Sequence, residues 1–524
     1  MIEMGSISMI PRIDFARRFL VLTVALASAL SCTGPHGPGR APNVSKLEID
    51  NWHELRSTDF ILYSRGSREH LETFAVDLAR YVAVVEQLVR SQPPKAPAQI
   101  FLVEDRASTL FIPHPSIGGY MDHSLAGFGG FMRGATHDPA YRNLLLHEYS
   151  HYLHLRSSNL NYPNWYTEGF AEFLGSTRTR DDVMEVGSAP PWILLQLEHR
   201  RLRKEEIDLT TIFSFERDGT RPDPSDFYPI SWAVVHYLSS NAARHRQLLS
   251  MLNHQSAGLH WKRAYDRSFP ESIELLSSRV SRHAEMLSRG TPSAVSYLPL
   301  DSLEVRDHWE IREVPRQEIL QLFGEAALRN TVYLSGGKGA NMQLAEALFR
   351  RAIELDPDDS KSRAGLAAAL SAQSKFDEAE IQLASFREDP EPSVESIVHA
   401  ADAIRWHAVS LGDEGDAIQR EQLLVAAIRL YQTALDARPK DAFALAGLGY
   451  SQLEAEDFTA ARMSLADARR VGEWDAELTL SQGWVEKQLG SIALARLFWK
   501  EVIRLGTEDE AKRAAALLDE VHSK

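Results

Sequence analysis

The sequence LLLHEYSH at residues 144–151 decides how this chain is interpreted. It contains the pattern H-E-x-x-H, in which His147 and His151 are four residues apart and Glu148 follows the first histidine. Residues four apart share one face of an α-helix, so both imidazoles can bind a single ion. The leucines before the first histidine indicate a buried helix face. The pattern is typical of a zinc site on a helix.

The same pattern carries a reaction. Zinc lowers the pKa of a bound water to about 7, and Glu148 would take the proton of that water as it attacks a carbonyl. A catalytic zinc site has three protein ligands plus water. The sequence WYTEGFAE follows at residues 165–172, and it places Glu168 near the start of a second predicted helix. We therefore predict Zn²⁺ as cofactor, held by His147, His151 and Glu168, with Glu148 as catalytic base.

Residues 144–172 resemble the gluzincin peptidases, the class that includes thermolysin and the aminopeptidase N-like enzymes. In that class the third ligand is a glutamate on a second helix, in an E-G-x-A or similar context, which Glu168 matches. The resemblance implies an α+β, thermolysin-like metallopeptidase domain. It also implies that Glu172, one turn after Glu168, hydrogen-bonds a ligating imidazole. A solvated carboxylate, or an exchange of roles with Glu168, is the alternative for Glu172.

A further part of the resemblance lies in FYPISWAVVHYL at residues 227–238. It is similar to a helix of the aminopeptidase-like gluzincins that opens with a tyrosine. There the tyrosine donates a hydrogen bond to the oxyanion, so the resemblance makes Tyr228 a candidate catalytic residue. The glycine and lysine of that family motif are not kept here, and a buried aromatic residue at a helix start is the alternative.

Two departures restrict the activity. The aminopeptidases carry G-x-M-E-N upstream, whereas this chain has GYMDH at 119–123, so we expect an endopeptidase rather than an aminopeptidase. Residues 127–131 are either an edge strand that pairs with an extended peptide or a plain glycine-rich turn. A metzincin site is excluded because His154 occupies the position where that pattern needs glycine.

The elements around these motifs are mixed. Apolar spacing predicts strands at 59–64 and 98–103 and one or two strands within 118–132. It predicts helices at 68–89, 141–155, 164–174 and 227–241, with helical segments continuing to about residue 289.

The pattern of apolar residues changes beyond residue 341. Small and apolar residues recur at helical offsets, and breakpoints occur at Pro357, Pro390, Pro439, Gly472 and Gly506, at intervals of 33, 49, 33 and 34 residues. The sequence resembles tetratricopeptide repeats, whose period is about 34 residues. The long interval carries about 15 extra residues near 412–421. The resemblance implies an all-α solenoid whose concave surface binds a protein partner; a generic array of helical hairpins is the alternative.

The N-terminus resembles an export signal. Three arginines between residues 12 and 18 precede 12 apolar or small residues, from Phe19 to Leu30, which is short of the roughly 20 that span a bilayer. Cys32, the single cysteine, follows this run and resembles the lipidated cysteine of bacterial lipoproteins, although Ala29 stands where that family prefers leucine. Ordinary signal cleavage nearby is the alternative. Lipidation implies an exported protein of the bacterial cell envelope that reaches the membrane only through its N-terminal lipid.

Composition bounds the remaining possibilities. The 524 residues suffice for two or three domains, and a net charge of −15 argues against nucleic acid as a partner. We predict a signal peptide at 1–31, a lipidated tether at 32–47, a gluzincin-like metallopeptidase domain at 48–290, a linker at 291–335 and a repeat array at 336–524.

The expected function is that of a zinc metallopeptidase acting on a peptide or protein substrate, with a repeat array that recruits a protein partner. The alternative is a non-catalytic envelope scaffold that keeps a vestigial peptidase domain.

Overall fold

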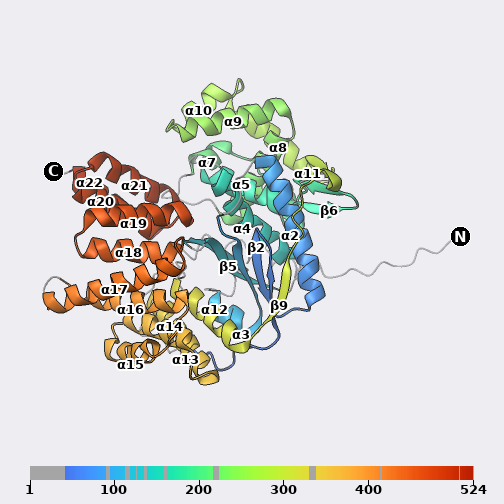
Figure 1. Cartoon of the computed structure of the whole chain (residues 1–524). Helices are drawn as coiled ribbons and strands as arrows, with labels where there is room; N and C mark the ends of the chain where they lie inside the picture. The colour runs from blue at the N-terminus through green and yellow to red at the C-terminus, as the bar shows by residue number, and fades with distance from the viewer. Residues whose placement is uncertain are drawn as a thin grey trace.

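The computed structural model describes residues 42–89, 95–112, 118–125, 127–134, 139–157, 162–215, 223–329, 338–412, 416–506 and 508–522. The predicted signal peptide, Cys32 and most of the predicted tether lie outside these ranges. The described chain is mostly helical, with a six-stranded sheet near its centre (Figure 1).

The sheet has the order β4-β5-β3-β2-β1-β9. Strands β2 and β3 and strands β3 and β5 are parallel, while the other neighbours are antiparallel. The predicted strands at 59–64, 98–103 and 118–132 agree with β2, β3 and the β4–β5 pair. The strand bounds are β1 Trp52–Arg56, β2 Phe60–Ser64, β3 Ala98–Val103, β4 Gly119–Ser124, β5 Gly127–Arg133 and β9 Glu310–Val314.

Both faces of this sheet are buried, which follows from the alternation of side chains along each strand. On one face Phe60 and Leu62 join an apolar core with helices α2 (Arg68–Val89) and α4 (Pro139–Ser157). On the other face Ile61 and Tyr63 join a second core with α3 (Asp105–Phe111) and α12 (Arg316–Arg329).

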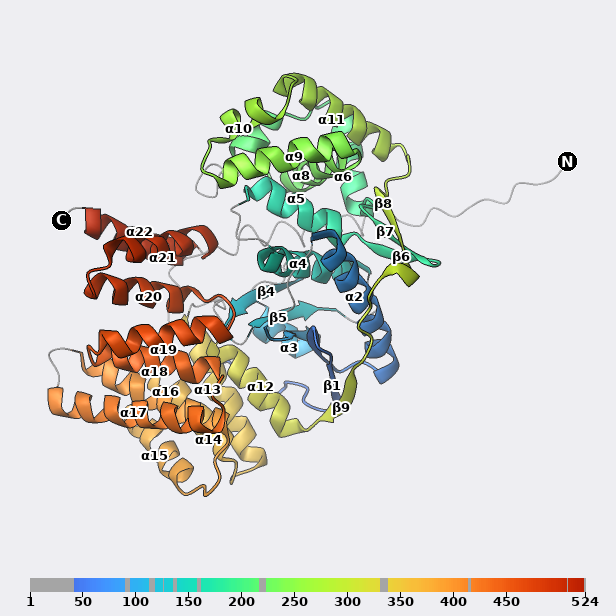
Figure 2. The same cartoon turned by 45° about the horizontal axis from the view of Figure 1, so that its top comes forward.

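A helical layer lies beyond α4 (Figure 2). Helix α5 (Asn164–Gly175) packs against both α4 and α8 (Pro224–Ser239). Helix α8 begins before the predicted residue 227 because Asp223 caps it, accepting a hydrogen bond from the Ser225 amide at 2.9 Å. The other elements here are β6 Arg178–Arg180, β7 Val183–Val186, α6 Pro191–Arg203, α7 Leu209–Ser214, α9 Ala242–Ser256, α10 Trp261–Ser268, α11 Ile273–Ser288, β8 Ser296–Pro299 and η1 Leu300–Ser302.

The C-terminal part is an array of helices in which each sequence breakpoint lies between two helices. Helices α16 and α17 contain 18 and 21 residues, against 12 each in α14 and α15, which accounts for the 15 extra residues in the long interval. The extra length therefore extends two helices. The bounds are α13 Lys338–Leu355, α14 Ser360–Ser371, α15 Phe376–Arg387, α16 Val394–Leu411, α17 Ala417–Ala437, α18 Ala442–Glu454, α19 Phe458–Val471, α20 Ala476–Gln488, α21 Ile492–Leu505 and α22 Glu508–His522.

Residues 291–329, which lie in the stretch predicted as a linker, are instead part of the fold. Strand β8 pairs with β7, and β9 pairs with β1 to form one edge of the large sheet. Helix α12 then packs on the sheet and on α13, so the array and the sheet share one apolar core. No helix in the described ranges is both long enough and apolar enough to span a bilayer.

Candidate metal centre

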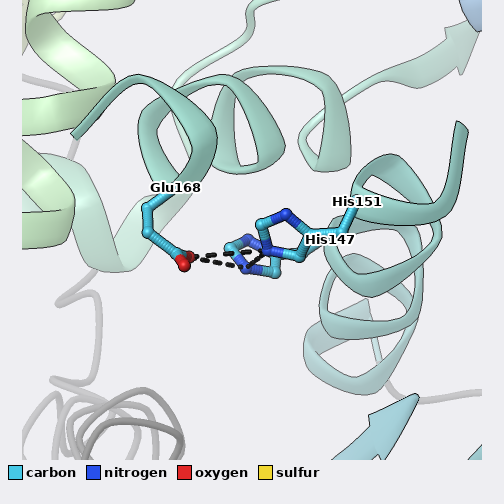
Figure 3. Close-up of side chains that lie close together, drawn as sticks. All are labelled: His147, His151 and Glu168. Carbon is cyan, nitrogen blue, oxygen red and sulfur yellow. Dashed lines mark hydrogen bonds and ion pairs between the residues drawn. The ribbon is translucent and has the colours of Figure 1, made fainter. Parts of the chain in front are cut away.

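Three side chains from two helices converge on one point, with their donor atoms facing one another (Figure 3). Nε2 of His147 and Nε2 of His151, both on α4, are 3.2 Å apart. Oε2 of Glu168, on α5, lies 3.4 Å from the first and 3.5 Å from the second. Donors about 2.0–2.1 Å from a tetrahedral zinc ion stand roughly 3.3 Å from one another, so this set of two imidazoles and a carboxylate fits zinc.

Helix α4 is held in place from behind. The Tyr81 hydroxyl on α2 donates to the Leu146 carbonyl at 2.9 Å and contacts Ser150 Oγ, which donates to the same carbonyl at 2.7 Å. Arg142, near the start of α4, forms an ion pair with Asp77 of α2. These bonds fix the turn of helix that carries His147.

Two glycines set how closely the helices approach. A Cβ added to Gly175 would lie 2.9 Å from the His147 backbone nitrogen, and one added to Gly169 would lie 2.5 Å from the Ser231 carbonyl oxygen. Helix α5 therefore contacts the backbone of α4 at one glycine and that of α8 at the other. Packing thus explains the glycine that follows Glu168, because Gly169 lets α5 lie directly against α8.

Glu172 lies next to the nitrogen of His147 that points away from the candidate metal position. Its Oε1 is 3.3 Å from Nδ1 of His147, an ion-pair distance without the alignment of a good hydrogen bond. Its side chain is 9% exposed, which disagrees with the alternative of a solvated carboxylate. A carboxylate at this position orients the ring so that Nε2 points at the shared point.

Glu148 is buried one position along α4 from His147. Its Oε1 has no hydrogen-bond partner, although the atom is buried. Burial raises the pKa of this carboxyl, and the neighbouring His147 and His151 only partly offset that effect. A buried carboxylate with an unpartnered oxygen is suited to accept a proton from a molecule that enters the site.

The electrostatics of the site favour a cation. Burial alone lowers the pKa of His147, but Glu172, Glu168 and Glu148 outweigh it and raise that pKa well above its ordinary value. Burial alone raises the pKa of Glu168, but His151 and His147 outweigh it and lower that pKa. Three carboxylates around two imidazoles thus stabilise positive charge, which either a proton or a metal ion supplies.

Tyr228 reaches the same site from α8. It is buried, and its ring centroid lies 6.4 Å from that of His147. The structure therefore brings together the six predicted site residues that it describes: His147, Glu148, His151, Glu168, Glu172 and Tyr228. The seventh, Cys32, lies outside the described ranges.

Residues 127–131 form neither an edge strand nor a plain turn. They belong to β5, which has neighbours on both sides, and the nearer edge of the sheet is β4, which contains residues 119–123. The side chain of His154 lies outside the described ones. The sequence patterns did not indicate Tyr81, Ser150 and Gly175. These residues support the site through contacts between helices, which no local pattern encodes.

Comparisons with known proteins concern the array. The tetratricopeptide repeat family model matches residues 348–381, which run from α13 through α14 into α15. A solved tetratricopeptide-repeat protein of Thermus thermophilus is similar at 17% identity and a TM-score of 0.31, over 34% of this chain and 91% of its own. A MamA structure is similar at 17% identity and a TM-score of 0.25, over 34% and 99%.

PilF of Pseudomonas aeruginosa is similar at 12% identity and a TM-score of 0.21, over 38% of this chain and 96% of its own. Comparison with curated proteins gave no match. The prediction of tetratricopeptide repeats is confirmed at residues 348–381. In this segment the alternative, a generic array of helical hairpins, is therefore wrong. The chain therefore carries a tetratricopeptide repeat, a helical scaffold of the type through which proteins contact other proteins.

Proposed function

We propose that this chain is a zinc-dependent endopeptidase with a tetratricopeptide array. The observation that carries the proposal is the convergence of His147, His151 and Glu168 beside the buried carboxylate of Glu148. Three protein donors leave a fourth position for water or substrate, as a catalytic zinc site requires. When bound, zinc would supply a Lewis acid that activates water and polarises a carbonyl.

The residues around that position have separate roles. Glu148 accepts the proton of the attacking water and delivers it to the departing amine; its burial and raised pKa suit both steps. Tyr228 donates its hydroxyl proton in a hydrogen bond to the carbonyl oxygen as negative charge develops there. Glu172 holds the His147 ring, Gly175 lets the ligand helix lie against α4, and Gly169 lets it lie against α8.

Metal analysis and proteolysis of an unfolded substrate test the proposal. Purified full-length chain should contain close to one zinc ion, and His151→Ala should lose it, while the exposed-residue control His245→Ala should keep it. Glu148→Gln should retain zinc and lose at least about 100-fold in rate. A wild-type chain that binds no zinc would overturn the assignment.

The alternative is a non-catalytic scaffold, favoured by the tetratricopeptide match at 348–381. A vestigial site has no physical need to keep ligands, base and Glu172 together, and this argues for the enzyme.

We also propose that the chain is exported and lipidated at Cys32. Incorporation of labelled fatty acid, lost in Cys32→Ser, tests the lipidation.

A further inference from the structure

The turn between β4 and β5 is buried against the repeat array. Leu125, directly after β4, is 6% exposed and belongs to the same apolar cluster as residues of three array helices. Those residues are Leu445 and Ala446 of α18, Ala461, Leu465 and Ala468 of α19, and Leu478 and Val485 of α20. An apolar side chain from the sheet therefore completes a core that otherwise consists of repeat helices.

The array leaves room for this turn at a glycine. A Cβ added to Gly472, between α19 and α20, would lie 3.0 Å from the Leu125 carbonyl oxygen and 3.0 Å from Ala442 Cβ. Gly472 has an extended backbone, with φ −86° and ψ 171°, that any residue can adopt. The glycine is therefore required by the close approach of the hairpin, and not by backbone conformation.

A charged contact attaches the sheet to the same junction. The Lys95 ammonium, just before β3, donates to the carbonyl of Gly472 at 2.7 Å and to that of Arg469 at 3.2 Å. Its backbone amide donates to Glu473 Oε1 at 3.1 Å. The last carbonyls of a helix lack partners within it and carry partial negative charge, so α19 offers Lys95 a cation site.

These contacts connect the array to the metal-binding helix. Strand β4 is one edge of the sheet and contacts α4, which carries His147 and His151. Figure 2 shows the β4–β5 hairpin directed toward the array, beside α19. Leu125, directly after β4, and Lys95, three residues before β3, are thus both held at the α19–α20 junction. For Lys95 the bonded residues lie 374 to 378 residues away in sequence.

We infer that the α18–α20 part of the array binds its own chain, and that it fixes the edge strand β4 beside the metal-binding helix. The occupant of this array surface is the β4–β5 hairpin, recognised by Leu125 in an apolar socket and by Lys95 on the carboxyl end of α19. The array acts here as a support for the sheet edge, in addition to any partner that it recruits elsewhere. The link to catalysis, though not the attachment itself, rests on the proposed peptidase function.

A larger side chain at Gly472 tests the attachment. Gly472→Val would meet the Leu125 carbonyl group and should therefore speed exchange of the 119–124 amides. The matched control is Gly339→Val, because nothing lies within 4 Å of a Cβ added there, and it should leave that exchange unchanged. Equal exchange of the 119–124 amides in the two variants would overturn the inference.

Hydrogen exchange tests the consequence. Leu125→Asp should speed exchange of the 119–124 amides by at least about tenfold, while β1 and β2 stay protected. Lys95→Ala should act in the same direction more weakly, and the exposed control Lys440→Ala should have no effect. Unchanged exchange of β4 in Leu125→Asp would contradict the inference.

Peptidase rate gives a separate measurement. Leu125→Asp should lower the rate several-fold with zinc content unchanged, because the edge strand is displaced and the ligands are not. If the wild-type chain shows no peptidase activity, the proposed function fails, and the exchange results still decide the attachment.

Discussion

At the scale of single residues, the candidate site depends on groups that hold the ligands as much as on the ligands. His147 has Nε2 directed at Glu168 and Nδ1 beside Glu172, so its ring lies between two carboxylates. A ring held at both nitrogens has one productive orientation. The orientation of a ligating imidazole in turn sets the affinity for the metal.

Glu172→Gln should therefore weaken zinc binding by about 10- to 100-fold without unfolding the chain, because the amide keeps the size of the side chain and loses its charge. Competition with a chelator of known affinity measures the change. The exposed Glu205→Gln is the control. Equal zinc affinity in the two variants would show that Glu172 does not contribute to metal binding.

The residues of the site differ in how far the sequence predicts them. His147 and His151 share a helix, so their spacing alone places both imidazoles together. Glu168 and Tyr228 come from other helices and are predicted only through the family resemblance. Tyr81 is 65 residues from the carbonyl that it binds, and no local pattern encodes such a contact.

At the scale of elements, the site is a close packing of three helices. Gly169 lies where α5 meets the backbone of α8, and the adjacent Glu168 is a candidate metal ligand. Any side chain at this glycine would contact the Ser231 carbonyl group, which cannot rotate away as a side chain can. The position of the ligand thus follows from the distance between two helices.

Gly169→Ala should push α5 away from α8 and move Glu168, with a loss of about 1–3 kcal/mol in unfolding free energy and a lower zinc content. Thermal unfolding and metal analysis of the same sample measure both effects. Gly339→Ala is the control, because nothing lies within 4 Å of a Cβ added there. Unaltered stability and zinc content in Gly169→Ala would show that the helices are not held at this distance.

Most elements of the sheet and the array follow from local patterns, but β9 does not. Only Val314 of this strand is buried, and three of its five residues are charged. Its partner β1 lies far away in sequence: Arg312 bonds Glu54, 258 residues earlier. A short, charged edge strand has no apolar run to mark it, and therefore the sequence of residues 291–335 predicts a linker.

At the scale of the whole molecule, one apolar core spans the boundary that we expected between a peptidase domain and a repeat array. Phe323 of α12 contacts the rings of Trp52, Phe101 and Phe111, with centroids 5.2, 5.5 and 4.7 Å away. Phe349 of α13 belongs to the same apolar cluster. The sheet and the first repeat helices therefore cover each other and are expected to unfold together.

Phe323→Ala tests this coupling, since truncating a buried phenylalanine costs about 3–5 kcal/mol. If sheet and array are one cooperative unit, the variant should lower the exchange protection of β3 and of α16 by similar factors. Hydrogen exchange of segments 98–103 and 397–404 in denaturant measures both at once. Leu322→Ala, on the same helix but only half-buried, should cost less.

The same core determines what a shortened chain can do. Ending the chain at residue 290 removes β9 and α12, which exposes Ile61, Phe101 and Phe131 on one face of the sheet and the β1 edge beside them. Exposed apolar area of this kind leads to aggregation, and an open edge adds to it. The truncated chain should therefore be insoluble or should bind a hydrophobic dye. A soluble, monomeric chain of 290 residues with a cooperative unfolding transition would instead establish a domain that folds independently, and the array would then be an accessory rather than a part of the fold.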